Sequence, residues 1–424
     1  MVVGRGQAGA SLDEAEIQRI VDEGVPAKLF DGKRVLVLTP DATRTFPLPL
    51  LSRVVGRAIG HRASRMDFMI ALGSHTPMSD HAIDTLFGLG PGERERLFPG
   101  SQFLNHRWDL PGTLEKIGTI PAREVRDLTR GLMDESADVV INRAIREYDL
   151  LLILGPVFPH EVIGFSGGNK YLFPGISGGE FLSFFHWMGA LITCPEIIGF
   201  KNTVVRATVD RAAAMVSVNR WCLAGVVGPN GRLAGLFAGA SEEAWSRAAD
   251  LSAQIHVVYK EQPFRTVLGL APAMYDELWV AGKVMYKLEP VVAEGGTLII
   301  HGPHVKEVSR TWGTHLLRTG YHVRDWFLAH PELCHDVPRA VLAHSTHVRG
   351  IGSMVGGVEK PRIQVVLATG IPEEVCRQIG LGYCDPGSIH PSEYADREDE
   401  GVLLVDHAGE VLHRLEQDRA RMKS

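Results

Sequence analysis

Residues 34–44 read RVLVLTPDATR, a continuous apolar, β-branched run that ends in a turn of polar residues. Such a run is typical of a strand that is buried on both faces of a parallel sheet. Similar apolar runs end in glycine or proline at residues 67–72 and 150–154, and a helical pattern over residues 47–61 separates the first two. This alternation predicts an α/β fold with a mostly parallel sheet flanked by helices.

The same alternation restarts after a charged, proline-containing break at residues 261–264. Strand-like runs follow at residues 266–270, 297–301 and 363–368, and a helical pattern covers residues 275–288. We therefore expect two lobes, each with a mostly parallel sheet flanked by helices, and an active site in the crevice between them.

The expected domains follow from this break. The N-terminal α/β domain covers residues 1–262, the C-terminal α/β domain covers residues 263–400, and residues 401–424 form a tail that we expect to pack back on the N-terminal domain. A hairpin with an Asn-Gly turn at residues 230–231 and a helix over residues 241–254 complete the first domain. Residues 88–130 are rich in glycine, proline and arginine, and we expect an insertion of undefined role there.

Composition excludes several classes of protein. A chain of 424 residues with 45% hydrophobic content can bury a large core. Its 44 basic and 50 acidic side chains give a net charge of −6 without a basic run, which argues against nucleic acid and acidic membrane surfaces as partners. Five scattered cysteines without a CxxC pair fit a reducing compartment. No apolar run resembles a signal or a membrane span, so we expect a cytoplasmic protein whose oligomeric state is open.

Polar side chains follow three of the predicted strands at their carboxyl ends. They are Asp41, Thr43 and Arg44 after the first strand, His75 after the second, and His160 with residues 166–170 (SGGNK) after the third. Ligands of open parallel sheets bind at this edge. Each residue alone has an ordinary explanation, such as an Asx turn for Asp41 or a surface charge for Arg44. Their recurrence at successive strand ends favours a functional site.

The SGGNK loop lies between two histidines, His160 and His186. Its glycines permit positive φ angles and a close approach of the backbone to a ligand beside Lys170. The loop lacks the Gly-Lys-Ser/Thr ending of a phosphate-binding P-loop, and Gly164 stands where a zinc-peptidase HExxH sequence requires its second histidine. We expect His160 to be exposed and His186, inside an apolar helix, to be buried with a hydrogen-bond partner or a metal ion.

These residue types suggest proton transfer at a carbon beside a carboxylate. Arg44 and a second cation can bind the carboxylate, while His75 and His160 can act as proton acceptors on opposite faces of the bound carbon. Two bases facing one stereocentre are what a racemase requires. Removing a proton from such a carbon is costly, so an electron sink would be needed.

The order and spacing of these elements resemble the lactate racemase family, the nickel-pincer nucleotide enzymes. The resemblance rests on residues 41–44 (DATR), 73–75 (GSH), His160, the SGGNK loop, Pro174-Gly175 and His186, and it extends over residues 275–303. It implies a racemase or epimerase that inverts carbon 2 of a 2-hydroxy acid by hydride transfer to and from the cofactor.

The resemblance also implies roles for individual residues. Lys170 would carry the nickel-pincer nucleotide, a pyridinium mononucleotide with nickel, through a covalent bond, and His186 would ligate the nickel. His75 and His160 would be the catalytic acid-base pair, and Arg44 and Lys283 would hold the substrate carboxylate. We expect Asp41, Thr43, Ser166 and Asn169 to hydrogen-bond the cofactor, and cofactor-biosynthesis machinery to be the partner for maturation.

One departure concerns substrate choice. Lactate-specific members of the family carry a Tyr-Gln pair where this chain has Trp279-Val280. A missing amide changes the polar pairing of the pocket, which discriminates between substrates more strongly than size does. We therefore expect a 2-hydroxy acid other than lactate, larger or derived from a sugar.

Two other functions fit the same residues. In the first, His75, His160 and His186 bind zinc and Asp41 acts as the base of a hydrolase or lyase. In the second, two lobes close on an anionic metabolite without chemistry, and Arg44 and Lys283 act as clamps.

Overall fold

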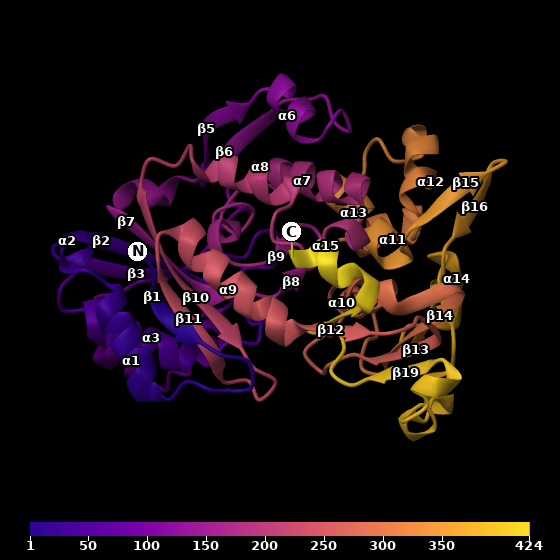
Figure 1. The fold of residues 1–424 in the computed structure, drawn as a ribbon. Coiled ribbons are helices and arrows are strands. Elements are labelled where there is room, and N and C mark those ends of the chain that lie inside the picture. The colour runs from indigo at the N-terminus through magenta and orange to yellow at the C-terminus, as the bar shows by residue number, and fades with distance from the viewer. Residues whose placement is uncertain (424) are drawn as a thin grey trace. The chain divides into compact units, whose positions relative to one another are not determined.

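The computed structural model describes residues 1–423, which form two compact units (Figure 1). Unit 1 contains Met1–Phe158, Phe165–Leu182 and Arg206–Ile255, and unit 2 contains Pro159–Gly164, Ser183–Val205 and the chain from His256 onward. The final passage between units therefore lies at Ile255, close to the expected boundary at residue 262. Two short segments of the first half, which sequence patterns assign to the N-terminal domain, belong to unit 2 instead.

Unit 1 is built on a seven-stranded sheet in the order β1-β11-β10-β7-β2-β3-β4. The strands are β1 (Val3–Gly6), β2 (Arg34–Thr39), β3 (Arg65–Ile70), β4 (Phe103–Asn105), β7 (Leu150–Pro156), β10 (Asn219–Val227) and β11 (Leu233–Gly239). All pairs from β10 to β4 are parallel, and only β1 and β11 run antiparallel to their neighbours. The three predicted strands β2, β3 and β7 lie side by side, so their carboxyl ends meet at one edge.

Helices pack against this sheet and bury its apolar strands. The amphipathic helices α1 (Glu14–Gly24), α3 (Leu48–Ile59) and α4 (Asp80–Phe87) pack their apolar residues against one face, where β2 and β7 contribute alternate side chains. The intervening side chains of β2 and β7 are buried as well, which explains why both strands are apolar throughout. Helices α8 (Val204–Ala213) and α9 (Ser241–His256) flank β10 and β11 in the sequence.

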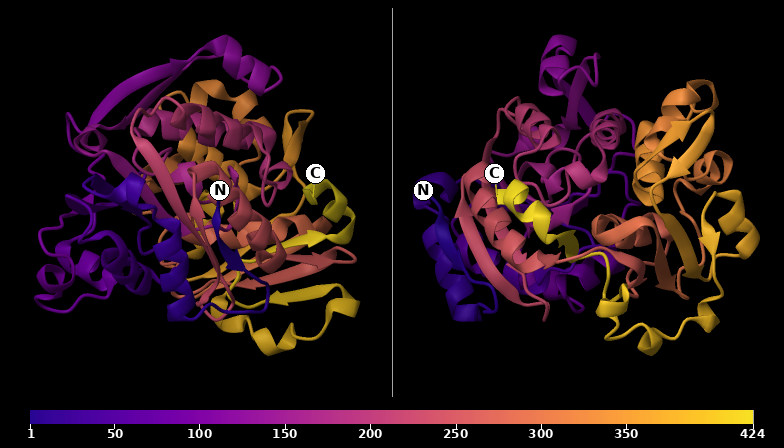
Figure 2. Two further views of the ribbon diagram at one scale, coloured as in Figure 1. Left: turned by 60° about the vertical axis from the view of Figure 1, so that its left-hand side comes forward. Right: turned by 45° about the vertical axis from the view of Figure 1, so that its right-hand side comes forward.

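The insertion at residues 88–130 is divided, since β4 belongs to the seven-stranded sheet whereas β5 (Leu114–Ile120) and α6 (Ala122–Leu128) lie outside it. It also contains α5 (Glu93–Leu97). Strand β6 (Ala137–Asn142) pairs antiparallel with β5 and does not join the main sheet. Both views in Figure 2 show β5, β6 and α6 standing away from the seven-stranded sheet.

Unit 2 contains a five-stranded sheet, all parallel, in the order β18-β17-β14-β13-β19. The strands are β13 (Phe264–Leu270), β14 (Val292–Gly302), β17 (Gln364–Thr369), β18 (Gly382–Tyr383) and β19 (Val402–Val405). Helices α10 (Leu278–Leu288) and α13 (Arg339–Arg349) pack on its core, and α11 (Gly313–Thr319), α12 (Arg324–Ala329) and α14 (Glu373–Gln378) surround it. A hairpin of β15 (Gly352–Val355) and β16 (Val358–Pro361) follows α13. The expected α/β class with parallel sheets is confirmed.

The C-terminal tail packs differently from our expectation. Strand β19 pairs with β13, and β20 (Leu412–Leu415) pairs with β12 (Val257–Lys260), so the tail belongs to unit 2. Its apolar run β19 forms an edge strand of the second sheet. Our expectation that the tail packs on the N-terminal domain is therefore wrong. No helix within residues 1–423 combines the length and the apolar character that crossing a membrane requires.

Candidate active site

Asp41 and His75 meet at the carboxyl edge of the first sheet. Strands β2 and β3 pair in register up to Thr39 and Ile70, so the loops that follow them emerge next to one another. His75 Nδ1 lies within hydrogen-bond distance of Asp41 Oδ2. The other oxygen, Asp41 Oδ1, accepts hydrogen bonds from the Thr43 hydroxyl at 2.7 Å and the Thr43 amide at 3.1 Å. Both oxygens of this carboxylate are thus engaged.

The charge of this pair follows from its surroundings. Asp41 is 8% exposed, and burial alone would raise its pKa. The opposing influences of His75, Arg44 and the Thr43 hydroxyl are stronger, and together they lower the pKa of Asp41 far below its ordinary value of 3.8. Because the ionised Asp41 accepts from Nδ1–H, the ring nitrogen of His75 that is left to exchange a proton with a substrate is Nε2. The side chain of His75 is 38% exposed, so Nε2 can serve a substrate as proton acceptor.

Arg44 places a positive charge beside this pair. Its Nη1 donates to the Thr43 carbonyl and to the Thr43 hydroxyl, each at 3.2 Å. A guanidinium carries five N–H donors, so these contacts fix its position and leave donors for a carboxylate.

The insertion also contributes to the position of His75. Trp108 Nε1 donates to the His75 carbonyl at 2.9 Å, and the Asn105 side chain bonds both the amide and the carbonyl of Met78. Sequence patterns assigned no role to residues 88–130, because nothing local marks which loop they contact.

The SGGNK loop is held tightly within unit 1. Gly167 and Gly168 have φ angles of +82° and +59°, as expected for glycines in this loop. A Cβ on Gly168 would lie 2.9 Å from the Trp245 side chain, and Trp245 Nε1 donates to the Ser166 carbonyl at 2.8 Å. The glycines therefore make room for a protein side chain rather than only for a ligand, which corrects our reason for their presence.

Asn169 is the centre of a buried polar network. Its amide nitrogen donates to Asp210 at 2.9 Å and Glu242 at 2.8 Å, and its carbonyl oxygen accepts from the Ser241 hydroxyl at 2.9 Å. Burial raises the pKa of Asp210, whereas at Glu242 hydrogen bonds and Arg220 outweigh burial and lower the pKa. The residue next to Lys170 is thus fixed by three partners from α8 and α9.

Arg206 supports the same loop from α8. It donates to the carbonyls of Phe165 and Gly167, and its guanidinium lies 4.0 Å from the centre of the Trp245 ring. Burial lowers its pKa to about 10. Sequence reasoning missed Arg206 and Trp245, since both lie in ordinary helical patterns far along the chain from the loop.

Two backbone contacts join the loop of His75 to that of Lys170. The Gly175 amide donates to the Lys170 carbonyl at 3.1 Å, and the Gly73 amide donates to the Gly175 carbonyl at 2.9 Å. On the sheet side, a Cβ at Gly155 in β7 would overlap the buried hydroxyl of Tyr171. The glycine at the end of the strand therefore lets the residue after Lys170 seat against the sheet.

Unit 2 holds His160 and His186. His160 is 8% exposed, and its Nδ1 lies 3.2 Å from the Val162 amide and 3.4 Å from a Glu161 oxygen. The preceding carbonyl, of Pro159, accepts a hydrogen bond from the buried ammonium of Lys287. His186, in α7 (Gly179–Ile192), is only partly buried. The expected exposures of the two histidines are therefore wrong in both cases, because His160 begins a buried segment while α7 keeps one side of His186 open.

Helix α10 carries Lys283 one turn before Lys287. Lys283 Nζ lies 4.7 Å from the centre of the buried Tyr275 ring. On the same helix, Trp279 lies against His344, with ring centres 4.0 Å apart. His344 in turn bonds the hydroxyls of Tyr286 at 2.8 Å and Tyr321 at 3.3 Å. No sequence signal singled out Lys287 or His344.

The expected site residues thus divide between the units. Unit 1 holds Asp41, Thr43, Arg44, His75, Ser166, Asn169 and Lys170, and unit 2 holds His160, His186 and Lys283. The Ser166 hydroxyl accepts from the Phe158 amide at 2.9 Å and its carbonyl accepts from Trp245 at 2.8 Å, so its described contacts are to protein groups. Within residues 1–423, no group of three or more His, Cys, Asp or Glu side chains is arranged to hold a metal ion.

An acid–imidazole pair and an arginine at the carboxyl edge of a parallel sheet, with a lysine loop bonded to them, define an α/β protein with an enzyme-like site. The family model described as the lactate racemase N-terminal domain matches residues 8–196. The lactate racemase of Thermoanaerobacterium thermosaccharolyticum is 26% identical over 319 residues, which cover 70% of this chain and 68% of that protein. The lactate racemase of Lactiplantibacillus plantarum is 24% identical over 285 residues, or 64% of this chain and 61% of that protein.

Solved structures agree with this assignment. A Thermotoga maritima protein matches with a TM-score of 0.87 and 30% identity, over 97% of this chain and 100% of that one. The lactate racemase apoprotein of T. thermosaccharolyticum matches with a TM-score of 0.71 and 20% identity, over 96% of this chain and 94% of that one, which supports the fold. The chain belongs to the lactate racemase family.

Proposed function

We propose that this protein is a racemase or epimerase that inverts carbon 2 of a 2-hydroxy acid. The observation that carries the proposal is the Asp41–His75 pair with Arg44 beside it. A binding protein needs the arginine to hold a carboxylate, but it has no use for a buried carboxylate that orients an imidazole. That arrangement is the usual way to prepare a histidine for proton transfer.

The roles within the pair differ. His75 Nε2 accepts the proton of the substrate hydroxyl on one face of carbon 2 and returns it when the configuration is restored. Asp41 holds Nδ1–H and stabilises the imidazolium that forms, so it is a positioning residue. Arg44 holds the substrate carboxylate through paired N–H donors.

We assign His160 to the acid–base role on the opposite face, with the difference that its Nδ1 accepts from the Val162 amide, so its neutral ring presents Nε2–H. Its ring is oriented by the Val162 amide and Glu161, and Lys287 fixes the backbone immediately before it. Lys283 provides the second cation for the carboxylate, held by its contact with the Tyr275 ring.

Lys170 and His186 are the residues that would hold a nickel-pincer nucleotide, Lys170 by a covalent bond and His186 through an imidazole nitrogen. The donor set fits, because one imidazole suits nickel and the described residues offer no protein-only metal cluster, so the nucleotide must supply the other ligands. When bound, the group supplies a hydride acceptor and donor for carbon 2. The chain's own contribution is a rigid loop that presents Lys170.

The four residues expected to contact the cofactor act mainly as supports. Asp41 and Thr43 bond one another and their neighbours, Ser166 bonds Phe158, and Asn169 bonds α8 and α9. We therefore assign Asn169 and Ser166 to positioning of the Lys170 loop, and Asp41 and Thr43 to positioning of His75 and Arg44.

The preferred substrate is a 2-hydroxy acid other than lactate. Val280 is buried and offers no side-chain donor or acceptor, and Trp279 is packed on His344. Without a side-chain amide at this position, the site favours a substrate whose groups other than the carboxylate and the 2-hydroxyl are bonded by other residues. Maturation requires cofactor-building machinery, and the five free thiols fit a cytoplasmic location.

Intact-mass and metal analysis of the full chain tests the cofactor assignment. Protein produced together with the maturation machinery should carry a nickel-containing nucleotide mass, and Lys170→Ala should lose it. Lys28→Ala, which changes an exposed lysine of α2 (Ala27–Phe30), should retain it. An adduct that persists in Lys170→Ala would contradict the assignment.

The loaded protein then tests the reaction. Pure enantiomers of 2-hydroxy acids, from lactate to sugar acids, are incubated with it, and chiral chromatography follows the change at carbon 2. We expect interconversion of a larger acid to exceed that of lactate. If lactate is the best substrate, the inference from Trp279-Val280 is wrong, and if no acid is interconverted, the proposed reaction is wrong.

A further inference from the structure

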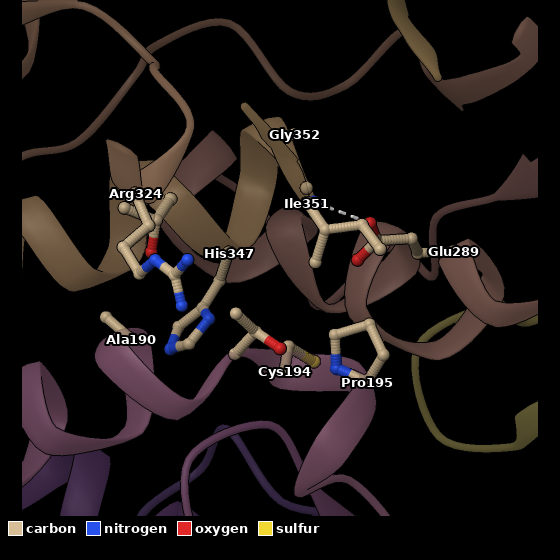
Figure 3. A pocket seen from close by; sticks show the side chains of 11 residues that line it. Ala190, Cys194, Pro195, Glu289, Arg324, His347, Ile351 and Gly352 are labelled. Carbon is tan, nitrogen blue, oxygen red and sulfur yellow. Dashed lines mark hydrogen bonds between the residues drawn. The ribbon is translucent and has the colours of Figure 1, made fainter. Parts of the chain in front are cut away.

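Unit 2 contains a pocket that none of the expected site residues lines. Its volume is about 210 Å³, and it lies between the end of α7, the start of α12 and the end of α13 (Figure 3). A single water needs only about 10–15 Å³ of such space, whereas drug-sized ligands fill about 300 Å³ or more. The size therefore suits a molecule of a few carbon atoms.

Two buried side chains reach this pocket with an unused polar atom. Glu289 is fully buried, and its Oε1 accepts a hydrogen bond from the Ile351 amide at 2.7 Å. Within residues 1–423, neither Glu289 Oε2 nor His347 Nε2 has a hydrogen-bond partner, although His347 is only 3% exposed. Leaving such an atom unpaired in the interior is unfavourable, and native proteins rarely tolerate it without a reason.

The backbone is strained at the same place. Thr193, which lines the pocket directly after α7, has a φ angle of +89°. This conformation is a genuine outlier for a β-branched residue, and such outliers cluster at ligand sites. Strain and unpaired atoms are independent observations, and both concern one cavity.

Arg324 supplies the positive charge. Its Nη1 donates to the Leu191 carbonyl at 2.8 Å and its Nε to Asp325 at 2.9 Å, while Nη2 also lies 2.9 Å from Asp325. These contacts engage three of the five N–H groups of a guanidinium and hold it in place. Figure 3 shows Arg324 and His347 on one side of the pocket and Glu289 on the other.

We infer that this pocket binds a small hydroxycarboxylate, with its carboxylate on Arg324 and its hydroxyl group between Glu289 and His347. Arginine is suited to carboxylates. A hydroxyl group both donates and accepts, so it can bond either of these two groups, Glu289 Oε2 or His347 Nε2, whether or not that group carries a proton. Burial lowers the pKa of His347 to about 4 and raises that of Glu289, so neither residue is forced to bring a charge into the pocket.

The inference goes beyond the proposed racemase site and does not depend on it. The pocket residues that carry the argument all belong to unit 2, whereas the Asp41–His75 pair and Arg44 belong to unit 1. The chain should therefore bind such an acid at two sites, one with Arg44 and one with Arg324. Substituting one of these arginines should remove binding at its own site only.

Calorimetric titration of the full-length protein, produced without the maturation machinery, tests the second place. The probe is glycolate, with acetate as the carboxylate without a hydroxyl and ethylene glycol as the hydroxyl without a carboxylate. We expect Arg324→Gln and Glu289→Ala each to weaken one glycolate site about tenfold or more while Arg44→Gln leaves that site unchanged. Acetate and ethylene glycol should bind it at least about tenfold more weakly.

Several outcomes would overturn the inference. One is glycolate binding that Arg324→Gln and Glu289→Ala leave unaltered, and another is acetate binding as tightly as glycolate. Arg324→Lys keeps the charge but not the paired geometry, so it should retain part of the affinity and shows that a loss in Arg324→Gln is not misfolding. If Arg44→Gln removes no glycolate binding at all, the proposed carboxylate contact of Arg44 in the racemase site is contradicted. The result for the Arg324 site does not depend on that outcome.

Discussion

Asp41 in unit 1 and Glu289 in unit 2 are both buried carboxyl groups in sites that also contain a histidine, yet they have opposite properties. Burial is the largest influence on each and raises both pKa values. Asp41 overcomes it through His75, Arg44 and Thr43, so its pKa falls. For Glu289, the influences that lower the pKa among the described residues are the Ile351 amide and the guanidinium of Arg362 at 3.9 Å, and its pKa stays raised.

The difference shows that close partners rather than depth decide the charge of a buried acid. Asp41 is a permanently ionised group that orients a base, which suits proton transfer. Glu289 is a group whose charge is unfavourable until a ligand or a proton reaches it, which suits recognition of a neutral hydroxyl group. Each prediction below tests one side of this contrast.

The largest effect should come from the charged pair. Asp41→Asn and His75→Ala should each lower the rate of racemisation by about 10²–10⁴-fold, because the base is misoriented or absent. Chiral chromatography of the product made by the cofactor-loaded protein measures it. Asp149→Asn is the matched control, since Asp149 pairs with Arg34 at the opposite edge of the same sheet. An active Asp41→Asn variant would remove the contrast between the two acids.

The next effect concerns the network beside Lys170. Asn169→Ala leaves Asp210, Glu242 and Ser241 without their shared partner, so the free energy of unfolding of unit 1 should fall by about 2–3 kcal/mol. Urea unfolding followed by circular dichroism measures the change.

A buried asparagine elsewhere in unit 1 provides the comparison. Asn142→Ala removes bonds to His106 and Ala144 and should destabilise the unit to a similar degree. Only Asn169→Ala should also reduce the fraction of Lys170 that carries the nucleotide mass. Equal adduct in both variants would show that the network has no part in positioning Lys170.

A smaller effect should appear in the pH dependence of Asp41. Because folding lowers its pKa below the ordinary 3.8, the ionised carboxyl adds stability above that pH and loses it as the pH falls through the folded value. Asp41→Asn should therefore be less stable than the wild type by about 2 kcal/mol at pH 7, and the difference should shrink below pH 3.8. A difference that is constant from pH 7 to pH 3 would mean that the charge of Asp41 contributes nothing.

The smallest effect should have the opposite sign. Folding raises the pKa of Glu289, so the wild type is most stable below its ordinary value of 4.5 and loses stability as the pH rises through the folded value. Glu289→Gln cannot ionise and keeps an acceptor for the Ile351 amide. It should gain up to about 1 kcal/mol relative to the wild type between pH 4 and pH 8. Thermal unfolding at both pH values measures this, and a loss instead of a gain would show that the ionised form is the favoured one.

Much of the fold could be predicted from periodicity. Strands β2, β3 and β7 lie where apolar runs end in glycine or proline, since strands buried on both faces need such runs. The error over the tail arises because a short apolar segment does not specify its partner strand. Pairing is decided by contacts far along the chain, such as β19 with β13.

The candidate site was predictable only where residues follow strands directly. Asp41, Arg44 and His75 follow from the position of loops at the carboxyl edge of a parallel sheet. The supports, Arg206, Trp245 and Lys287, could not be predicted, because a buried cation in a helix has the same local pattern as an exposed one. The pocket around Glu289 and His347 arises from the ends of three helices, which no single stretch of sequence reveals.

Gly155 sets a limit on how this chain can change over evolution. Any side chain there collides with the Tyr171 hydroxyl, so residues 155 and 171 cannot drift independently. A larger residue at one position requires a smaller residue at the other in the same lineage. A single added methyl group at residue 155 should thus displace Tyr171, and with it the loop that presents Lys170, without altering any charged group.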